Sequence, residues 1–402
     1  MARKKILFVG EAATLAHVAR PLVLAAALDR ERFDVSFACD PRYGWMLSEF
    51  SGRFFSLPSV GSEHFLAALA RGAPVYDTGT LSRYVEEDLK LLADASPDLV
   101  IGDFRLSLSI SARLARIPYV AISNCYWSPY WRPRRYVVPT LPLTRCLPLP
   151  IADALFRLAR PIAFALHCRP LNRVRRKYGL SSLGNDLRRI YTDADYVVYA
   201  DIAELFTGVR LPAEHRMIGP ILWSPPVQTP AWWSSIEADR PVLYITMGSS
   251  GKGNLLPEIL RSLGPLDVTV IAASAGDAVL GAVPPNAHVT RYLPGLEAAQ
   301  RASLVICNGG APTCQQALSA GVPVIGLPTN LDQFLNMDTL VEAQVGVVHR
   351  ADRFSAAKLR GTVNAMLTHR NYREAAEHIA RAARENDARA NFRGFLERLL
   401  LR

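Results

Sequence analysis

The sequence predicts an α/β protein of two domains, each built on a parallel β-sheet. Short apolar runs typical of buried parallel strands alternate with helical patterns in both halves of the chain. The chain has 402 residues, of which 50% are hydrophobic, and this suits two domains of ordinary size better than one small core. Between the two series, residues 224–230 are rich in proline and polar residues, so they form the best linker candidate.

The first half is predicted to be a βαβ series. A buried strand at residues 6–9 ends at Gly10, and a loop then leads into a helix that begins near His17. Further strands are expected at residues 33–39, 54–57, 99–103, 119–122, 196–200 and 217–221, with helices at 84–93 and 108–115. Short crossovers of this kind imply a right-handed parallel sheet.

Two segments of the first half depart from this alternation. Residues 126–133 are aromatic and broken by proline, so we expect a loop or the wall of a binding site rather than a core element. Residues 151–177 have a largely helical pattern despite Pro161 and Pro170, with arginine at many turns.

The second half restarts the pattern. A strand at residues 242–247 leads into the glycine-rich turn Gly248-Ser249-Ser250, and further strands are expected at 268–272 and 289–293. The strand 304–307 is followed by the turn Asn308-Gly309-Gly310, a helix to about residue 321 and another strand at 322–327. Residues 371–402 are predicted to be helical, with one short break.

The stretch 304–336 is the most informative part of the sequence. Glycines after a buried strand let the backbone approach a ligand closely, and Pro312 suits the first turn of the next helix. The unpaired N–H groups and the positive end of a helix dipole then meet at one point, which favours an anion. An ordinary tight turn between strand and helix is the alternative explanation.

This stretch resembles the donor-binding signature of nucleotide-sugar glycosyltransferases of the UDP-glycosyltransferase type, including the bacterial enzymes that act on natural products and lipids. In that family a His-Gly-Gly turn opens a helix, a Glu follows in its second turn, and an Asp-Gln pair follows the next strand. The matching residues here are Asn308, Gly309, Gly310, Thr313, Gln316, Asp332, Gln333 and, as a helper, Asn336. Three residues differ, since Asn308 replaces His, Pro312 replaces Gly and Gln316 replaces Glu.

The resemblance implies a GT-B fold, in which two Rossmann-like domains face each other and the C-terminal helix crosses back to the first. It divides the chain into an acceptor-binding domain (1–223), a linker (224–239), a nucleotide-sugar-binding domain (240–380) and a returning helix (381–402). It also implies inverting transfer of a hexose from a UDP- or dTDP-sugar to a hydroxyl of a lipophilic small-molecule or lipid acceptor. The donor is a co-substrate, and neither a cofactor nor a metal is expected.

Transfer to a hydroxyl needs a base, because an alcohol is a poor nucleophile at neutral pH. The run at residues 16–21 resembles the family's first-domain histidine motif, which makes His17 the candidate base. Asp103 ends a strand of the same sheet and matches the acid that holds this base. The structural alternatives are a surface or capping histidine and a helix-capping aspartate.

The remaining donor contacts are also implied by the resemblance. Gly248, Ser249 and Ser250 match the loop that approaches the phosphates, although this is not a Walker sequence. Tyr292 and Leu293 match the place where the family stacks an aromatic ring on the base and reads its edge through the main chain, and simple packing is the alternative there. Asp332 and Gln333 match the pair that holds sugar hydroxyls.

The net charge of +10 is concentrated in one segment. Residues 132–177 contain eleven Arg and Lys residues against one acid, Asp153, which accounts for the whole imbalance. This segment either contacts an anionic membrane surface or forms a solvated helix face with arginine stems over apolar neighbours. No nucleic-acid-binding module is present, so nucleic acid is not an expected partner.

We expect a cytoplasmic protein that is peripheral to the inner face of the membrane. The six cysteines lack metal-binding spacing, so reduced thiols are expected, and no apolar run reaches the roughly 18–20 residues needed to span a bilayer. Two alternatives to a transferase remain. One is a nucleotide-sugar epimerase of the same architecture, and the other is a catalytically weak partner subunit that binds a nucleotide sugar.

Overall fold

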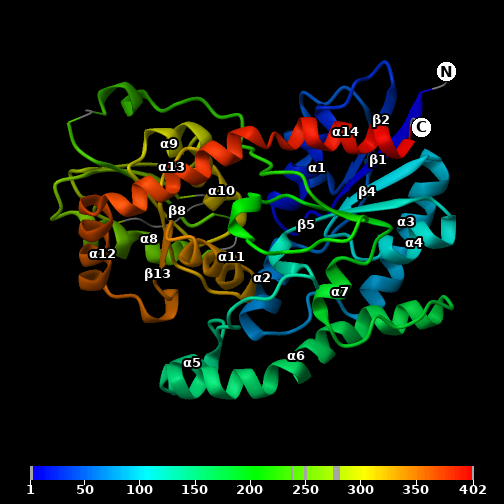
Figure 1. Ribbon diagram of the computed structural model, residues 1–402, viewed down its shortest axis with the longest axis horizontal. Coiled ribbons are helices and arrows are strands. Elements are labelled where there is room, and N and C mark those ends of the chain that lie inside the picture. The colour runs from blue at the N-terminus through cyan, green and yellow to red at the C-terminus, as the bar shows by residue number, and fades with distance from the viewer. Residues whose placement is uncertain (1–2, 237–238, 249–250, 275–280, 401–402) are drawn as a thin grey trace.

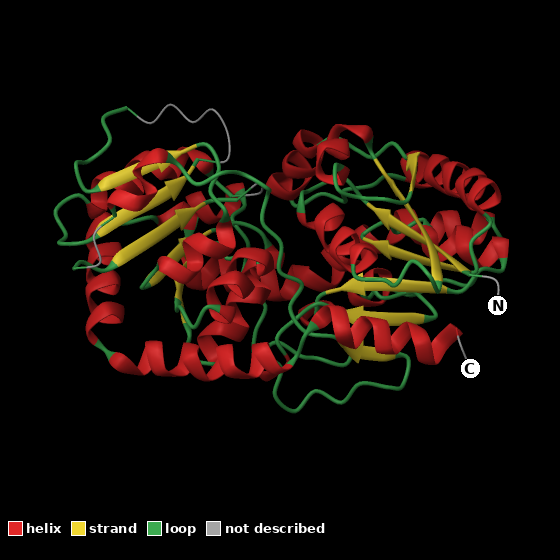
Figure 2. Cartoon of the chain, turned by 90° about the horizontal axis from the view of Figure 1, so that it is seen from above, coloured by secondary structure: helices red, strands yellow, loops and turns green. Residues whose placement is uncertain are grey.

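The computed structural model describes residues 3–236, 239–248, 251–274 and 281–400. It contains two parallel sheets, each covered by helices, that lie in separate domains side by side (Figures 1 and 2). The predicted α/β class and the two Rossmann-like domains are therefore confirmed. Within the described residues, no helix is long and apolar enough to cross a membrane.

The first sheet has seven parallel strands in the order β3-β2-β1-β4-β5-β6-β7. They are β1 (Lys4–Gly10), β2 (Phe33–Cys39), β3 (Arg53–Ser56), β4 (Leu99–Asp103), β5 (Tyr119–Ser123), β6 (Tyr196–Tyr199) and β7 (His215–Met217). The chain builds outward from β1 on one side and from β4 on the other, so the switch point lies between these two strands. Gly10 pairs with Asp103 in this register, which places the loop after β1 beside the acid.

The second sheet has six parallel strands in the order β10-β9-β8-β11-β12-β13. They are β8 (Val242–Thr246), β9 (Thr269–Ala273), β10 (Ala287–Thr290), β11 (Leu304–Cys307), β12 (Val324–Gly326) and β13 (Gly346–Val348). Its switch point lies between β8 and β11, where Thr246 pairs with Cys307. The turn that follows Cys307 therefore emerges at the position where open α/β sheets bind ligands.

Helices cover both faces of each sheet (Figure 2). Those of the first half are α1 (Ala16–Ala26), α2 (Ser62–Arg71), α3 (Thr78–Ala95), α4 (Leu108–Ala115), α5 (Pro142–Cys146), α6 (Leu149–Lys177) and α7 (Leu187–Tyr191). Those of the second half are α8 (Leu256–Leu263), α9 (Gly295–Arg301), α10 (Ala311–Ser319), α11 (Leu331–Glu342), α12 (Ala356–Thr368), α13 (Arg370–Glu385) and α14 (Ala388–Leu400).

The C-terminal helices connect the two domains. Figure 1 shows α13 and α14 running across both domains in succession. Phe392, Phe395 and Leu396 of α14 are buried in the core that contains β1 and α1 of the first domain. The break between the two helices packs against Gly219, which follows β7. Gly219 has a φ of 98°, and a Cβ atom on it would lie 2.2 Å from the carbonyl oxygen of Asn386 in the break. Only glycine fits at this contact.

Two expectations for the first half were wrong in detail. Strand β7 ends at Met217 rather than at residue 221, because the chain turns out of the sheet at the positive φ of Gly219. The aromatic segment was not expected in the core, yet Tyr126, Trp127 and Trp131 are at most 9% exposed. Tyr126 and Trp127 belong to the short 3₁₀ turn after β5 and also line the cavity described below, as expected for the wall of a binding site, whereas Trp131 lies beyond that turn.

Candidate active site

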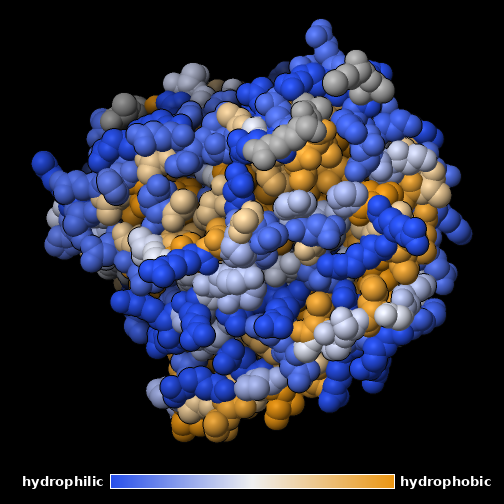
Figure 3. Space-filling model, turned by 45° about the vertical axis from the view of Figure 1, so that its right-hand side comes forward, coloured by the Kyte–Doolittle hydropathy of each residue, from blue (hydrophilic) through white to orange (hydrophobic). Residues whose placement is uncertain are grey.

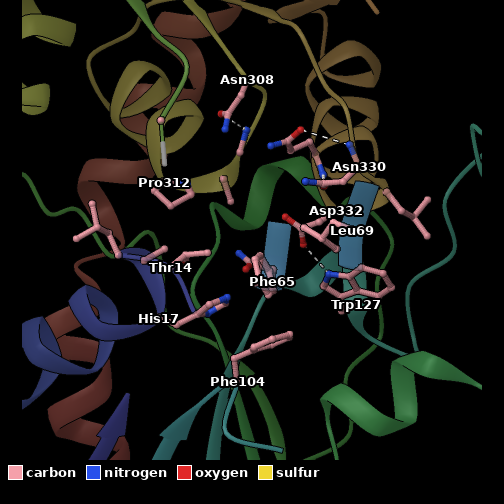
Figure 4. Close-up of a pocket in the computed structure, with 18 of the residues that line it drawn as sticks. Thr14, His17, Phe65, Leu69, Phe104, Trp127, Asn308, Pro312, Asn330 and Asp332 are labelled. Carbon is pink, nitrogen blue, oxygen red and sulfur yellow. Dashed lines mark hydrogen bonds between the residues drawn. The ribbon is translucent and has the colours of Figure 1, made fainter. Parts of the chain in front are cut away.

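A cavity of about 1030 Å³ lies between the two domains. The first domain contributes the start of α1, the end of β4 and one face of α6, whereas the second contributes the ends of β8 and β11 and the start of α11. Figure 4 shows the imidazole of His17 facing the open centre of this cavity, opposite Asn308 and Pro312. The switch points of both sheets therefore open into one space.

His17 and Asp103 are in direct contact. The Nδ1 atom of His17 lies 2.8 Å from Oδ1 of Asp103, whose side chain is 1% exposed. The ring of Phe104 stacks on the imidazole at 4.6 Å, and Phe104 holds a left-handed φ of 60°, a conformation that residues other than glycine rarely adopt. A carboxylate on Nδ1 favours the tautomer that leaves Nε2 free to accept a proton. This pair can therefore serve as a base.

Arg20 also binds the carboxylate of Asp103, a contact that the sequence reasoning missed. Its Nε donates to Oδ2 at 2.7 Å and its Nη2 to Oδ1 at 2.8 Å, while Nη1 donates to Oδ1 of Asn124 at 2.7 Å. Nη2 also lies 3.2 Å from Nδ1 of His17, but the shorter contact of Nδ1 with the carboxylate sets the tautomer. Arg20 follows His17 by three positions, so both side chains lie on one face of α1. The guanidinium fixes the orientation of the Asp103 carboxylate.

The turn after β11 forms the opposite wall. Oδ1 of Asn308 accepts a hydrogen bond from the Gly310 N–H at 3.0 Å, and Gly309 has a φ of 78°. A Cβ at Gly309 would lie 2.6 Å from Cγ of Met337, so the turn needs glycine there. Helix α10 begins at Ala311 with Pro312 in its first turn, and Thr313 lines the cavity. The arrangement is that of an anion site at a helix N-terminus.

Two amides bond to backbone carbonyl oxygens, one of them in this turn. Nδ2 of Asn336 donates to the carbonyl oxygen of Gly309 at 2.9 Å, so Asn336 holds the turn from behind. Nε2 of Gln316 donates to the carbonyl oxygen of Trp223 at 2.5 Å. Its Oε1 lies close to Gly295, since a Cβ atom on that glycine would be 2.8 Å from Oε1. Gln316 lines the cavity but is 9% exposed.

Asp332 and Gln333, the predicted sugar-binding pair, make different kinds of contact. Asp332 lines the cavity, and its Oδ1 accepts a hydrogen bond from the indole Nε1 of Trp127 at 2.7 Å, across the domain boundary. Gln333 also lines the cavity, but its Oε1 accepts from the backbone and hydroxyl of Thr329 at 2.8 and 3.0 Å. Gln333 and Asn330 form a reciprocal cap on α11, so its amide oxygen is committed to the helix.

The other predicted donor residues within the described part of the chain also line the cavity. Gly248 has a φ of 58°, and a Cβ there would lie 3.2 Å from Nδ2 of Asn308. Ser249 and Ser250 lie outside the described residues. Tyr292 and Leu293 line the cavity and are 40% and 3% exposed, so the tyrosine ring is the accessible one. In the described part of the chain, no three His, Cys, Asp or Glu side chains gather as metal ligands.

Comparison with known proteins identifies the family. Residues 257–391 match the family model described as "Erythromycin biosynthesis protein CIII-like, C-terminal domain". Over 380 residues, 94% of this chain, the sequence is 53% identical to the "PGL/p-HBAD biosynthesis glycosyltransferase" of Mycobacterium tuberculosis (strain ATCC 25177 / H37Ra), of which the alignment covers 89%. The chain belongs to this family of glycosyltransferases.

Two other relatives show the range of the family. This glycosyltransferase is 50% identical over 380 residues to the "PGL/p-HBAD biosynthesis rhamnosyltransferase" of Mycobacterium bovis (strain BCG / Pasteur 1173P2), with 94% of this chain and 84% of that protein aligned. It is 54% identical over 262 residues to an "Inactive PGL/p-HBAD biosynthesis glycosyltransferase" of the same strain, covering 65% of this chain and 71% of that protein.

Solved structures confirm the GT-B fold of the glycosyltransferase. The spinosyn forosaminyltransferase SpnP matches over all of both chains with a TM-score of 0.73 at 19% identity. The spinosyn rhamnosyltransferase SpnG complexed with thymidine diphosphate matches over 98% of this chain and 99% of its own with a TM-score of 0.69 at 16% identity.

A chain of hydrogen bonds links the two walls of the glycosyltransferase's cavity. Asp201, which is 1% exposed, accepts from Nδ2 of Asn124 at 2.8 Å and from the backbone N–H of Cys125 at 2.6 Å. From the other domain, Nε2 of Gln315 on α10 donates to Asp201 at 2.8 Å and to the carbonyl oxygen of Ala200 at 2.8 Å. Burial raises the pKa of Asp201 to about 6. We call the series His17, Asp103, Arg20, Asn124, Asp201 and Gln315 the interdomain chain.

Proposed function

We propose that this glycosyltransferase moves a hexose from a dTDP- or UDP-sugar to a hydroxyl of a lipophilic small-molecule or lipid acceptor and inverts the anomeric configuration. One observation carries the proposal. The His17–Asp103 pair and the helix N-terminus at Asn308–Thr313 line the same cavity from opposite domains. A base and an anion site that face each other across a cavity are what a single displacement at a sugar carbon requires.

In the proposed reaction, Nε2 of His17 takes the proton of the acceptor hydroxyl. The acceptor oxygen then forms a bond to the anomeric carbon on the face opposite the nucleotide, and the bond from that carbon to the diphosphate oxygen breaks. Asp103 stabilises the imidazolium that results, while the first-turn N–H groups of α10 stabilise the negative charge on the leaving diphosphate.

The donor that we favour is a dTDP-linked deoxyhexose. Gln316 matches the position of a family glutamate that would accept from ribose hydroxyls, and its amide, held by the bond from Nε2 to the Trp223 carbonyl, offers one acceptor oxygen instead of two. A deoxyribose presents one hydroxyl fewer to this position. Support also comes from a relative named a rhamnosyltransferase and from a structural neighbour complexed with thymidine diphosphate.

The acceptor is proposed to be lipophilic because apolar side chains dominate its end of the cavity. Phe65 and Leu69 of α2 and Phe156 and Phe164 of α6 line the cavity there. A peripheral contact of residues 132–177 with an anionic membrane, on the cytoplasmic side, belongs to the same proposal. The six cysteines are free thiols, and Sγ of Cys307 and Cys314 lie 3.8 Å apart.

The test is transfer by purified protein from dTDP- and UDP-hexoses to a phenol with an alkyl chain, with the product's anomeric configuration read by NMR. His17→Ala should lower kcat by about 100- to 10,000-fold, whereas the dTDP-induced shift in melting temperature should remain. His378→Ala, at an exposed histidine of α13, is the matched control.

Three outcomes would contradict the proposal. Near-normal turnover by His17→Ala would exclude the base. Nucleotide binding without transfer to any acceptor would indicate a partner subunit, and isomerisation of the donor without an acceptor would indicate an epimerase.

A further inference from the structure

The outward face of α6 carries a row of exposed apolar side chains. Leu158 and Ile162 are 78% and 66% exposed, and Ile151, Leu155 and Leu166 are 43% to 50% exposed. Their spacing keeps all five within an arc of about 80° around the helix. We call these five residues the apolar arc. Water-exposed leucine and isoleucine in such a row are uncommon on a soluble surface and mark an interaction site.

Positive charge continues the apolar arc toward the C-terminus of α6. Arg169, Arg173 and Arg176 are exposed and fall on the same side of the helix, about one, two and three turns beyond Leu166. Among the described residues, none of these three arginines forms an ion pair with an acid. The acid of this segment, Asp153, accepts a hydrogen bond from the backbone N–H of Val138 instead. The face is therefore apolar in its first turns and cationic in its last.

The apolar arc is continuous with the cavity. Leu155 belongs to the apolar arc and also lines the cavity. Phe156, Ala159 and Ala163, on the neighbouring strip of α6, line the cavity too. One helix thus presents apolar side chains to the outside and to the acceptor end of the cavity. A hydrocarbon chain can pass from one to the other without contacting a charged side chain of this strip.

We propose that the apolar arc, together with Arg169, Arg173 and Arg176, docks on an anionic bilayer, and that the acceptor enters the cavity directly from that bilayer. This inference rests on the proposed function, since it names the source of the acceptor. The leucine and isoleucine side chains sit at the boundary between headgroups and acyl chains, and the arginines contact lipid phosphates. The acceptor is accordingly an amphiphile whose hydroxyl reaches His17 while its chain lies along α6.

Charge favours a bilayer over a second copy of the chain. Two copies of a protein of net charge +10 would bring arginine-rich faces together, whereas an anionic surface attracts them. Figure 1 places α6 along the lower edge of the molecule, and Figure 3 shows apolar side chains gathered at that edge beside strongly hydrophilic ones. The face is therefore accessible on the outside of the protein.

Vesicle sedimentation tests the docking itself. The full-length protein should bind vesicles of equimolar phosphatidylcholine and phosphatidylglycerol, and should bind pure phosphatidylcholine more weakly. Leu158→Glu/Ile162→Glu should weaken binding by about a hundredfold, because two apolar side chains leave the interface. The control Leu114→Glu/Val341→Glu adds the same two negative charges at exposed apolar residues elsewhere, and it should bind vesicles as the parent does.

A second variant separates charge from apolar contact. Arg169→Gln/Arg173→Gln/Arg176→Gln should lose most of the preference for phosphatidylglycerol and much of the dependence of binding on salt. This variant retains every residue of the apolar arc. Its residual binding to neutral vesicles therefore measures the apolar contribution alone.

Activity then tests delivery of the acceptor. With a short-chain acceptor in solution, Leu158→Glu/Ile162→Glu should turn over like the parent, since neither side chain lines the cavity. With a long-chain acceptor in anionic vesicles, its rate should fall at least about tenfold. If no acceptor is glycosylated, the proposed function fails, and sedimentation still decides the docking.

The inference is overturned if the parent does not bind anionic vesicles, or if the Glu variant binds them equally well. It is also overturned if light scattering shows a dimer that this variant dissociates, because the arc would then be an interface between two copies. An unchanged rate on the vesicle-borne acceptor would refute delivery through this face.

Discussion

Replacing Gln315 with leucine tests whether the two domains must be locked together for transfer. Gln315 lies on α10, the helix whose N-terminus is proposed to hold the leaving diphosphate, and its amide donates to Asp201 and to the carbonyl of Ala200 in the other domain. Leucine has a similar volume but makes neither bond. The change therefore leaves the fold of each domain intact and removes one polar contact between them.

The size of the expected effect follows from the two hydrogen bonds that Gln315 donates. A hydrogen bond to a carboxylate contributes about 1.5–3 kcal/mol and one to a neutral carbonyl about 1 kcal/mol. Asp201 retains Asn124 and the Cys125 N–H as donors, so it is not left unpaired. The observed arrangement of the domains should thus lose about 2–4 kcal/mol relative to one in which they separate. If the transition state needs this arrangement, kcat/KM falls by about 30- to 1,000-fold.

The assay is steady-state transfer combined with calorimetric binding of dTDP. The affinity for dTDP should change by less than about threefold, because Gln315 does not line the cavity. Gln300→Leu, at an exposed glutamine of α9, is the control for a Gln-to-Leu change on a surface helix. Wild-type kcat/KM in Gln315→Leu would refute the coupling. A loss of dTDP affinity matching the loss of activity would instead indicate damage to the donor site.

Three further predictions concern the same network and turn. Burial raises the pKa of Asp201 from 3.8 to about 6, so the folded state binds this proton more tightly than the unfolded chain does. The stabilisation by this proton is full below about pH 4 and is lost as pH rises through about 6. When the pH is lowered from 7 to 4, the free energy of unfolding of the parent, measured by urea denaturation, should therefore rise by about 2 kcal/mol relative to that of Asp201→Asn. Equal pH profiles of the two proteins would contradict this. Arg20→Gln should lower kcat by about 10- to 100-fold with little change in dTDP affinity, because Asp103 loses the cation that fixes it, and an unchanged kcat would show that His17 alone orients the carboxylate. Gly309→Ala should lower the melting temperature and abolish the dTDP-induced shift, because Cβ would approach Met337 at a positive φ, and a retained shift would show that dTDP does not contact this turn.

The sequence predicted the sheets and their ligand-binding edges because local patterns encode them, whereas the His17–Asp103 contact was implied by the family resemblance. Buried strands and glycine turns identify the carboxyl ends of β1, β4, β8 and β11, and these ends meet wherever a parallel sheet forms. The contact of His17 with Asp103 then follows from the neighbouring positions of β1 and β4.

What the sequence did not reveal depends on how the domains meet. Trp127 and Asp332 lie in different domains, and so do Asp201 and Gln315, so no local pattern pairs them. Gln333 is a different case. Its spacing from Asn330 matches a capping box, which would have indicated that its amide oxygen serves the helix.

Helix α10 gives the interdomain chain its significance for catalysis. Among the described residues that line the cavity, Arg20 is the only arginine or lysine, and its guanidinium is already bonded to Asp103 and Asn124. Asn308 supplies no charge, so in the proposed reaction we expect the N–H groups and dipole at the start of α10 to stabilise the leaving diphosphate. These act only over a short range, so the helix must be held at a fixed distance from the base. Gln315, in the second turn of that helix, is bonded through Asp201 to the residues that orient His17, and one continuous set of hydrogen bonds therefore holds both the proposed base and the proposed leaving-group site.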